Sequence, residues 1–136
     1  RVDRRTTTPT SNRLLTAVPK AERARLESHC KRVTLKTRQV LYRQGESVDC
    51  LYFPTSGVVS LLSIMPDGRC AEVGIVGSDG AIGVHVVYGL RMMPCEAVVQ
   101  ASGEALALPV RVLRDNATAG GRLSTHLCRY AHALLL

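Results

Sequence analysis

Short apolar runs separated by turn signals dominate the middle of the chain. Between positions 33 and 109 the runs are VTLK, QVLYR, CLYF, VVSLLSIM, CAEVGIV, EAVVQA and EALALP. Turn signals cut them at QGES, PTSG, MPDGR, GSDG and ASGE. The spacing is roughly the 8 to 12 residues of an antiparallel barrel or sandwich. We therefore expect short antiparallel strands, with Pro66-Asp67-Gly68 as the clearest hairpin turn.

A helical pattern of apolar residues precedes the first strand. Pro19 suits the first turn of a helix over residues 20–30. Leu26, Cys30 and Val33 continue one apolar stripe along it. The pattern predicts one small amphipathic helix at the amino-terminal side of a mainly β fold.

The carboxy-terminal end returns to a helical pattern. A helix begins at Pro109, and the Gly120-Gly121 pair separates it from a final helix over residues 121–136. One side of the final helix carries Leu123, Leu127, Tyr130 and Leu134, at steps of four, three and four. This stripe either packs back on the barrel or pairs with a second copy. Because the helix is terminal and ends in apolar residues, we favour pairing and predict a homodimer through these four residues.

The net charge of +7 is unevenly distributed. Residues 1–43 contain twelve Lys or Arg against three acids, a balance of +9, and residues 44–136 contain six against eight, a balance of −2. The excess lies on a basic tail, residues 1–11, which we expect to be flexible, and on one exposed helix face. No aromatic residues interleave with these cations to stack bases. We therefore interpret the basic surface as solvated rather than as a DNA-binding site.

The sequence carries no membrane or secretion signal. No apolar run approaches the roughly 18 to 20 residues that a membrane-spanning helix needs, and the first residues lack the apolar middle of a secretory signal. We expect a cytoplasmic protein with no membrane partner. The chain begins with Arg and ends inside an apolar helical pattern without a stop signal, so we expect it to be a piece of a longer protein.

Residues that usually carry metal or catalytic chemistry are scattered. The five cysteines stand at least twenty residues apart without a CxxC pair, and we expect reduced, buried thiols. Of the four histidines only His85 lies in a predicted strand region, and the HxH of a cupin metal site is missing. Ser56 in the PTSG turn has no His near it in sequence. We therefore predict no metal site, no cofactor and no catalytic residues, and we interpret the protein as a non-enzyme.

One run carries a specific resemblance. In VLYRQGESVDCLYFPTSGVVSLL, Gly45-Glu46 and Tyr52-Phe53 precede Gly57, and a DGR turn follows. With this spacing the chain resembles the cyclic-nucleotide-binding-like domain of the Crp/Fnr family of bacterial transcription regulators. The resemblance covers residues 12–136 and implies a double-stranded β-roll, similar to a cupin jelly roll, with an amino-terminal helix and a carboxy-terminal dimerisation helix. It also implies an effector pocket and, beyond residue 136, a helix-turn-helix that binds DNA.

The resemblance also locates the effector pocket. In family members that bind cyclic AMP, a phosphate cassette reads approximately G-E-L-G, a loop, then R-S-A or R-T-A. The Glu accepts from the ribose hydroxyl and the Arg pairs with the cyclic phosphate. The corresponding residues here are Gly80, Ala81, Ile82 and Gly83, then Cys95, Glu96 and Ala97. Ala81 thus stands in place of the Glu and Cys95 in place of the Arg, after a loop longer than usual, and Glu96 adds repulsion near the phosphate.

The loss of both charged anchors argues against cyclic AMP. A charge-assisted hydrogen bond contributes on the order of 1.5 to 3 kcal/mol, so the two losses cost roughly 3 to 6 kcal/mol, or two to four decades of affinity. Arg91 could swing in as a substitute cation, but we favour a surface position for it. The expected pocket lining is apolar and includes Val86, Val87, Tyr88, Met92 and Met93. We therefore expect a different effector, or none.

Three hypotheses follow for the function. In the first, which we favour, the chain is the sensor and dimerisation part of a Crp/Fnr-type regulator. A small molecule other than cyclic AMP, or a redox change at a thiol such as Cys95, shifts the pose of the final helix. The second is a stand-alone β-roll that binds a small molecule or a protein, which a stop codon directly after Leu136 would favour. The third is a cupin-like metalloenzyme, which less than stoichiometric metal would discard.

Overall fold

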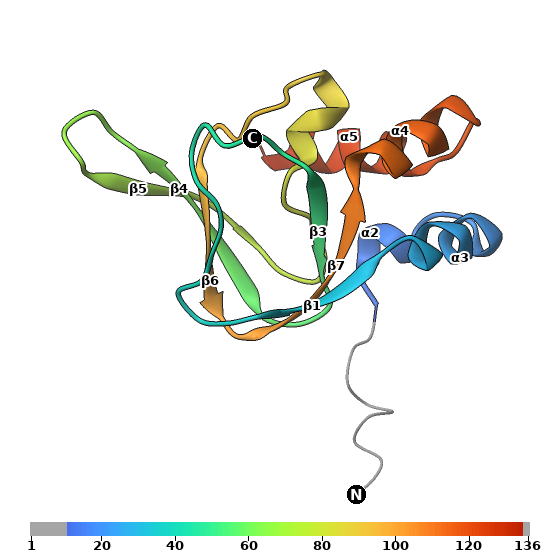
Figure 1. The fold of residues 1–136 in the computed structure, drawn as a ribbon, viewed down its shortest axis with the longest axis horizontal. Coiled ribbons are helices and arrows are strands. Elements are labelled where there is room, and N and C mark those ends of the chain that lie inside the picture. Colours follow the sequence, from blue (N-terminus) through green and yellow to red (C-terminus); the bar gives the residue numbers. More distant parts are fainter. Residues whose placement is uncertain (1–10, 135–136) are drawn as a thin grey trace, which may run out of the picture.

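Two antiparallel sheets form the body of the protein (Figure 1). The computed structural model describes residues 11–134. The strands are β1 (Lys31–Leu35), β2 (Val40–Tyr42), β3 (Cys50–Pro54), β4 (Val58–Ile64), β5 (Cys70–Val76), β6 (Glu96–Ala101) and β7 (Gly103–Pro109). One sheet has the order β1-β7-β3 and the other β2-β6-β4-β5. The seven runs predicted from the sequence are all strands, and the mainly β fold with flanking helices is confirmed.

Helices precede and follow the strands. They are α2 (Arg13–Thr16), α3 (Lys20–Ser28), the 3-10 helix η1 (Val84–Tyr88), α4 (Val110–Thr118) and α5 (Leu123–Leu134). Figure 1 shows α2, α3, α4 and α5 gathered beside the β1-β7-β3 sheet, while the β4–β5 hairpin projects on the other side. The predicted flexible tail lies, apart from Ser11, outside the described residues. In the described part of the chain, no helix has both the length and the apolar content that crossing a membrane requires.

The β4–β5 hairpin turns where the sequence predicts. The backbone amide of Met65 donates to the carbonyl of Arg69 (2.7 Å), which closes the turn. Asp67 accepts from the Arg69 amide at 3.0 Å and pairs with its guanidinium at 2.7 Å. The Pro-Asp-Gly segment is therefore held by its own local bonds. The strands then pair from Val59 opposite Val76 to Ile64 opposite Cys70.

The core fills the space between the two sheets and beneath the helices. Alternate residues of the strands point inward, and Leu51, Phe53 and Val59 have no exposed surface. On the helical side the core includes Leu15 and Leu26. A single core thus ties the helices to the β-roll.

The apolar stripe of α5 also belongs to this core. Leu123 and Leu127 have no exposed surface, because η1, α2 and α4 pack against α5. Tyr130 and Leu134 are half-buried and pack against the same core. The prediction that all four residues form a dimer interface is therefore wrong for Leu123 and Leu127, whose side chains the protomer itself covers. Dimerisation through α5, including Tyr130 and Leu134, remains a prediction.

Candidate functional site

The segment that connects β5 to β6 contains the predicted effector site, and we call residues 80–97 the cassette segment. Its first part lies against β3: the amide of Ile82 donates to the carbonyl of Tyr52 (2.9 Å) and the amide of Tyr52 donates back (3.1 Å). Ala81 and Ile82 are both 1% exposed. Gly83 has a left-handed φ of +96°, which a glycine adopts without strain, and it begins η1. His85 lies in η1 and not, as predicted, in a strand.

The last part of the cassette segment enters β6. Cys95 is 5% exposed and Ala97 is fully buried. Burial raises the pKa of the Cys95 thiol, so it stays protonated at neutral pH. Glu96 lies on the opposite face of the strand, and its carboxylate is 3.8 Å from the Arg43 guanidinium. Ala97 thus faces the core while Glu96 faces away from it, and the assignment of Glu96 to the effector site stays a prediction.

The intervening loop pairs with the turn that follows β2. The amide of Gly45 donates to the carbonyl of Met93 (2.8 Å), and the amide of Val48 donates to the carbonyl of Arg91 (2.8 Å). This pairing buries Met93 and leaves Met92 60% exposed. Arg91 is exposed and lines a cavity beside α4, a cavity that neither Ala81 nor Cys95 lines. Of the two methionines predicted to line the pocket, only Met93 is buried.

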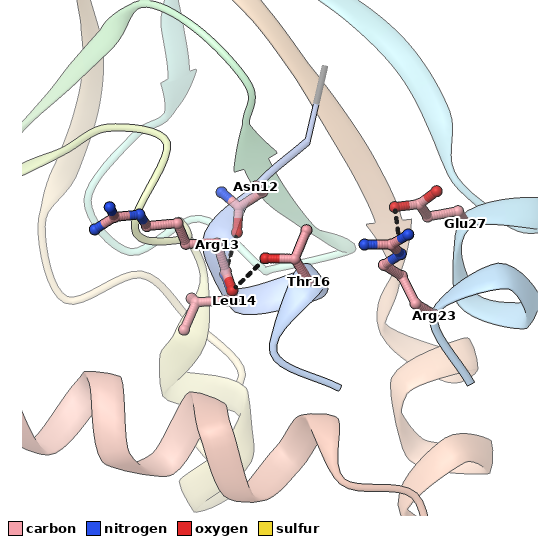
Figure 2. A network of polar contacts seen from close by, with 6 residues as sticks. All are labelled: Asn12, Arg13, Leu14, Thr16, Arg23 and Glu27. Carbon is pink, nitrogen blue, oxygen red and sulfur yellow. Dashed lines mark hydrogen bonds and ion pairs between the residues drawn. The ribbon is translucent and has the colours of Figure 1, made fainter. Parts of the chain in front are cut away.

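One hydrogen bond joins the start of the cassette segment to the amino-terminal helix, and a second joins that helix to β3. Asn12 is fully buried, and its amide group donates to the carbonyls of Pro54 and Gly80, both at 2.8 Å. Its side-chain oxygen caps α2 by accepting from the Leu14 amide at 2.9 Å (Figure 2). The sequence analysis did not identify this role. The signal for it is an Asn two residues before the apolar pair Leu14-Leu15, which is a helix-capping pattern.

Tyr130 of α5 rests on the same glycine. A Cβ added at Gly80 would overlap the hydroxyl and ring atoms of Tyr130, so the close approach requires a glycine. Burial raises the pKa of Tyr130 to about 12, and a hydrogen bond from the backbone of Ala81 opposes that rise. The phenol is therefore neutral at physiological pH. Within the protomer, Tyr130 packs α5 against the cassette segment, and its predicted role in dimer contact stays a prediction.

The amino-terminal end of α5 is held by a buried carboxylate. Glu22 of α3 is 6% exposed, and its Oε2 accepts from the amides of Arg122 (2.8 Å) and Leu123 (3.2 Å) and from Asn116 Nδ2 (3.1 Å). Burial alone would raise the pKa of Glu22, but these hydrogen bonds and the nearby Arg25 lower it overall. We call Glu22, Asn116, Arg122 and Leu123 the Glu22 junction. A negative group at this end of a helix is also favoured by the helix dipole.

The remaining thiols and imidazoles do not assemble a site. All five cysteines are free, and Cys70 is exposed. Burial lowers the pKa of His85, whose Nδ1 has no hydrogen-bond partner among residues 11–134. Within these described residues, no three His, Cys, Asp or Glu side chains come together as metal ligands could.

Comparison with known proteins places this geometry in a family. Residues 32–117, more than half of the chain, match the sequence profile of the cyclic nucleotide-binding domain. The amino-terminal domain of a transcriptional regulator from Streptomyces coelicolor A3(2) is similar, with a TM-score of 0.70 and 26% identity over 91% of this chain and 87% of that one. No curated protein sequence matches the chain.

Two further solved structures share the fold. The sensor domain of the transcriptional regulator DNR from Pseudomonas aeruginosa has a TM-score of 0.69 and 17% identity, over 91% of this chain and 83% of that one. The catabolite activator protein of Thermus thermophilus has a TM-score of 0.68 and 22% identity, over 91% of this chain but only 56% of that one. The profile and the shared fold confirm the resemblance to Crp/Fnr sensor domains.

Proposed function

We propose, since the chain belongs to the cyclic nucleotide-binding domain family, that it is the effector-sensing and dimerisation part of a Crp/Fnr-type transcription regulator whose effector is not cyclic AMP. DNA binding would then belong to a segment outside residues 1–136. One observation carries the proposal: the two cassette positions that hold charges in cyclic AMP-binding members are occupied here by Ala81 and Cys95, and both side chains are buried.

The physical reason is the cost of binding a phosphate without charged partners. A cyclic phosphate loses its hydration when it enters a closed pocket and needs charge-assisted hydrogen bonds in return. Ala81 offers no side-chain acceptor to a ribose hydroxyl, and the protonated thiol of Cys95 offers no positive charge. Arg91 lines a cavity beside α4 whose lining does not include Ala81 or Cys95. These features support an effector without a phosphate in the cassette pocket.

The contacts around the pocket support an uncharged, largely apolar effector. Ile82, Val84 and Met93 are buried in the cassette segment, and His85 provides one neutral nitrogen without a protein partner among the described residues. A redox change at Cys95 is the weaker alternative, because oxidation proceeds through the thiolate and burial disfavours the thiolate.

A mechanism for signalling follows from the contact between Tyr130 and Gly80. An effector that binds between the cassette segment and α5 has to change how the Tyr130 ring rests on Gly80. The pose of α5 is then coupled to occupancy, because the effector binds one arrangement of the helix better than the other. In a homodimer formed along α5, such a shift would be transmitted to both copies. The side chains available for pairing are the exposed ones, including Thr125, Arg129 and Ala133.

Calorimetric titration with cyclic AMP and cyclic GMP tests the proposal. The protein is titrated at near-physiological salt, with a cyclic AMP-binding family member as the positive control. We expect no heat of binding up to millimolar nucleotide. Micromolar binding that survives Arg91→Gln would show that the cassette segment holds the phosphate without its usual charges, and it would refute the proposal. The oligomeric state is measured in parallel by sedimentation velocity, where a monomer at high micromolar concentration would refute dimerisation.

A further inference from the structure

A cavity of about 300 Å³ lies beside the start of α4. Its lining includes Arg91, Arg111 and Arg114, together with Ser47, Asp49 and Pro109, and we call it the arginine cavity. Val86 and Arg91 of the cassette segment reach this lining, but Ala81, Cys95 and Ala97 do not. The arginine cavity therefore lies apart from the buried positions of Ala81 and Cys95, where the proposed effector binds.

Backbone hydrogen bonds fix the three segments that meet at the arginine cavity. The amide of Val48 donates to the carbonyl of Arg91 (2.8 Å), which holds the cassette loop beside residues 47–49. The amide of Val110 donates to the carbonyl of Asp49 (2.9 Å), which holds the start of α4 beside the same residues. Arg111 and Arg114 are three apart on α4 and so lie on one side of it. These hydrogen bonds hold in place the backbone segments that carry the three arginine side chains.

The charges at the arginine cavity are unbalanced. None of the three arginines forms an ion pair or a side-chain hydrogen bond with any residue between 11 and 134, whereas Arg23, Arg32, Arg43 and Arg69 each pair with a carboxylate. Asp49 is the single acid in the lining, so three positive charges face one negative charge. Like charges held together in a concave site attract anions from solution. The positive charge of the cavity therefore favours a bound anion, because no carboxylate of the described residues pairs with the three arginines.

We propose that the arginine cavity binds a small phosphorylated molecule through a terminal phosphoryl group. A guanidinium presents paired N–H donors that match two phosphate oxygens, and two or three such groups can surround one phosphoryl. A terminal phosphoryl carries close to two negative charges, which equals the excess of positive charge in the lining. A DNA backbone phosphate has the same oxygen chemistry but carries one charge and lies on a convex duplex, so it fits this concave site less well.

Calorimetry with inorganic pyrophosphate as the probe tests this site. The full chain is titrated at low salt, and Arg111→Gln and Arg114→Gln are compared with Arg32→Gln, a control that changes the net charge equally but lies on β1. We expect each cavity substitution to weaken binding about tenfold, the loss of one charge-assisted contact, and the control to leave it nearly unchanged. Asp49→Asn should strengthen binding, because it removes the one repulsive charge.

The outcomes separate the site from general surface charge and from DNA. Equal losses in Arg32→Gln and Arg111→Gln would mean diffuse attraction and would overturn the proposal, as would the absence of pyrophosphate binding at millimolar concentration. A fluorescent duplex is titrated in a second arm. Duplex binding that depends on Arg111 and Arg114 without pyrophosphate binding would assign the surface to DNA and also overturn the proposal. Because the three arginines are exposed, thermal melting should show that all variants fold.

Discussion

The cassette segment and the Glu22 junction both hold α5, but they do so by different physical means. The cassette segment meets α5 through shape, because the Tyr130 ring rests where Gly80 has no side chain. The Glu22 junction meets it through charge, because one buried carboxylate accepts from two backbone amides at the start of the helix and from Asn116. The contact between Tyr130 and Gly80 leaves no room for an added atom at Gly80, and the Glu22 junction requires a negatively charged oxygen.

This difference separates the parts of α5 that can move from those that cannot. The Glu22 junction satisfies buried donors that would otherwise lack partners, so breaking it carries a large cost. The contact of Tyr130 with Gly80 is mainly van der Waals packing, which a ligand of suitable shape can replace. We therefore expect α5 to pivot about its fixed amino-terminal end when the cassette segment binds its effector. The following substitutions test the two contacts separately.

The largest effect is expected from Glu22→Ala. The change leaves three donors without their acceptor, and a buried unsatisfied donor costs about 1–3 kcal/mol. Since Glu22 and Asn116 line a cavity that water can enter, we expect the free energy of unfolding to fall by about 3 kcal/mol. Urea denaturation measures it. Glu27→Ala is the control on the same helix: its carboxylate lies 4.0 Å from Arg23 on the surface (Figure 2), so the loss should stay below about 0.5 kcal/mol. Similar losses in both variants would contradict the assigned role.

A smaller loss of stability is expected from Gly80→Ala. The added Cβ overlaps the Tyr130 ring, and overpacking of this kind costs about 1–3 kcal/mol. Gly77→Ala is the matched control, because the nearest atom to a Cβ at that position is 3.8 Å away. In the Tyr130→Ala background, Gly80→Ala should cost little further stability, because the ring atoms that its Cβ would overlap are gone. Additive effects in the double-mutant cycle would show that the two residues do not interact.

The Glu22 junction also makes stability depend on acid pH. The folded-state pKa of Glu22 lies below its ordinary value of 4.5, so the unfolded chain binds the proton more tightly. The stabilisation from Glu22 is therefore complete above the unfolded-state pKa and is lost as the pH falls through the lowered folded-state pKa. The unfolding free energies of the wild type and Glu22→Gln are measured from pH 6 down to pH 3. We expect the difference between the two proteins to become smaller as the pH falls. A constant difference across that range would mean that the charge of Glu22 does not contribute.

The smallest effect concerns reactivity and not stability. Because Cys95 is buried and burial raises its pKa, we expect alkylation by iodoacetamide to be slower than at exposed Cys70 by a factor on the order of ten or more. Mass spectrometry of the labelled peptides gives both rates in one sample. Cys95 labelling as fast as Cys70 labelling would show that the cassette segment opens readily, and it would revive the redox hypothesis.

Local pattern was sufficient to predict most of the fold. The seven strands have alternating or continuous apolar runs with turn signals between them, and α4 begins after Pro109 as the pattern predicts. The exceptions are α2, which the pattern did not predict, and η1, where His85 was assigned to a strand region. A short apolar run is compatible with a strand or a helix, and only its packing against α5 decides between them.

The site was only partly predictable, because some of its contacts join residues that are far apart in the sequence. That Ala81 and Cys95 replace charged residues can be read from the sequence by resemblance, because the cassette pattern is local. The outward position of Glu96 next to buried Ala97 also follows from a local rule, because successive residues of a strand point to opposite faces. The positions of Arg91 and Tyr130 could not be read in this way. Arg91 is placed by a loop that pairs with a distant turn, and Tyr130 contacts a glycine fifty positions earlier.

The sequence by itself thus determined the elements, the family and the loss of the cassette charges, since each depends on residues close together in the chain. Only the tertiary structure decided which face of α5 packs against the core of its own protomer. A heptad-like stripe has the same sequence signature whether it packs on its own roll or on a second copy. The choice depends on whether other elements of the chain cover Leu123 and Leu127, and here η1, α2 and α4 do so.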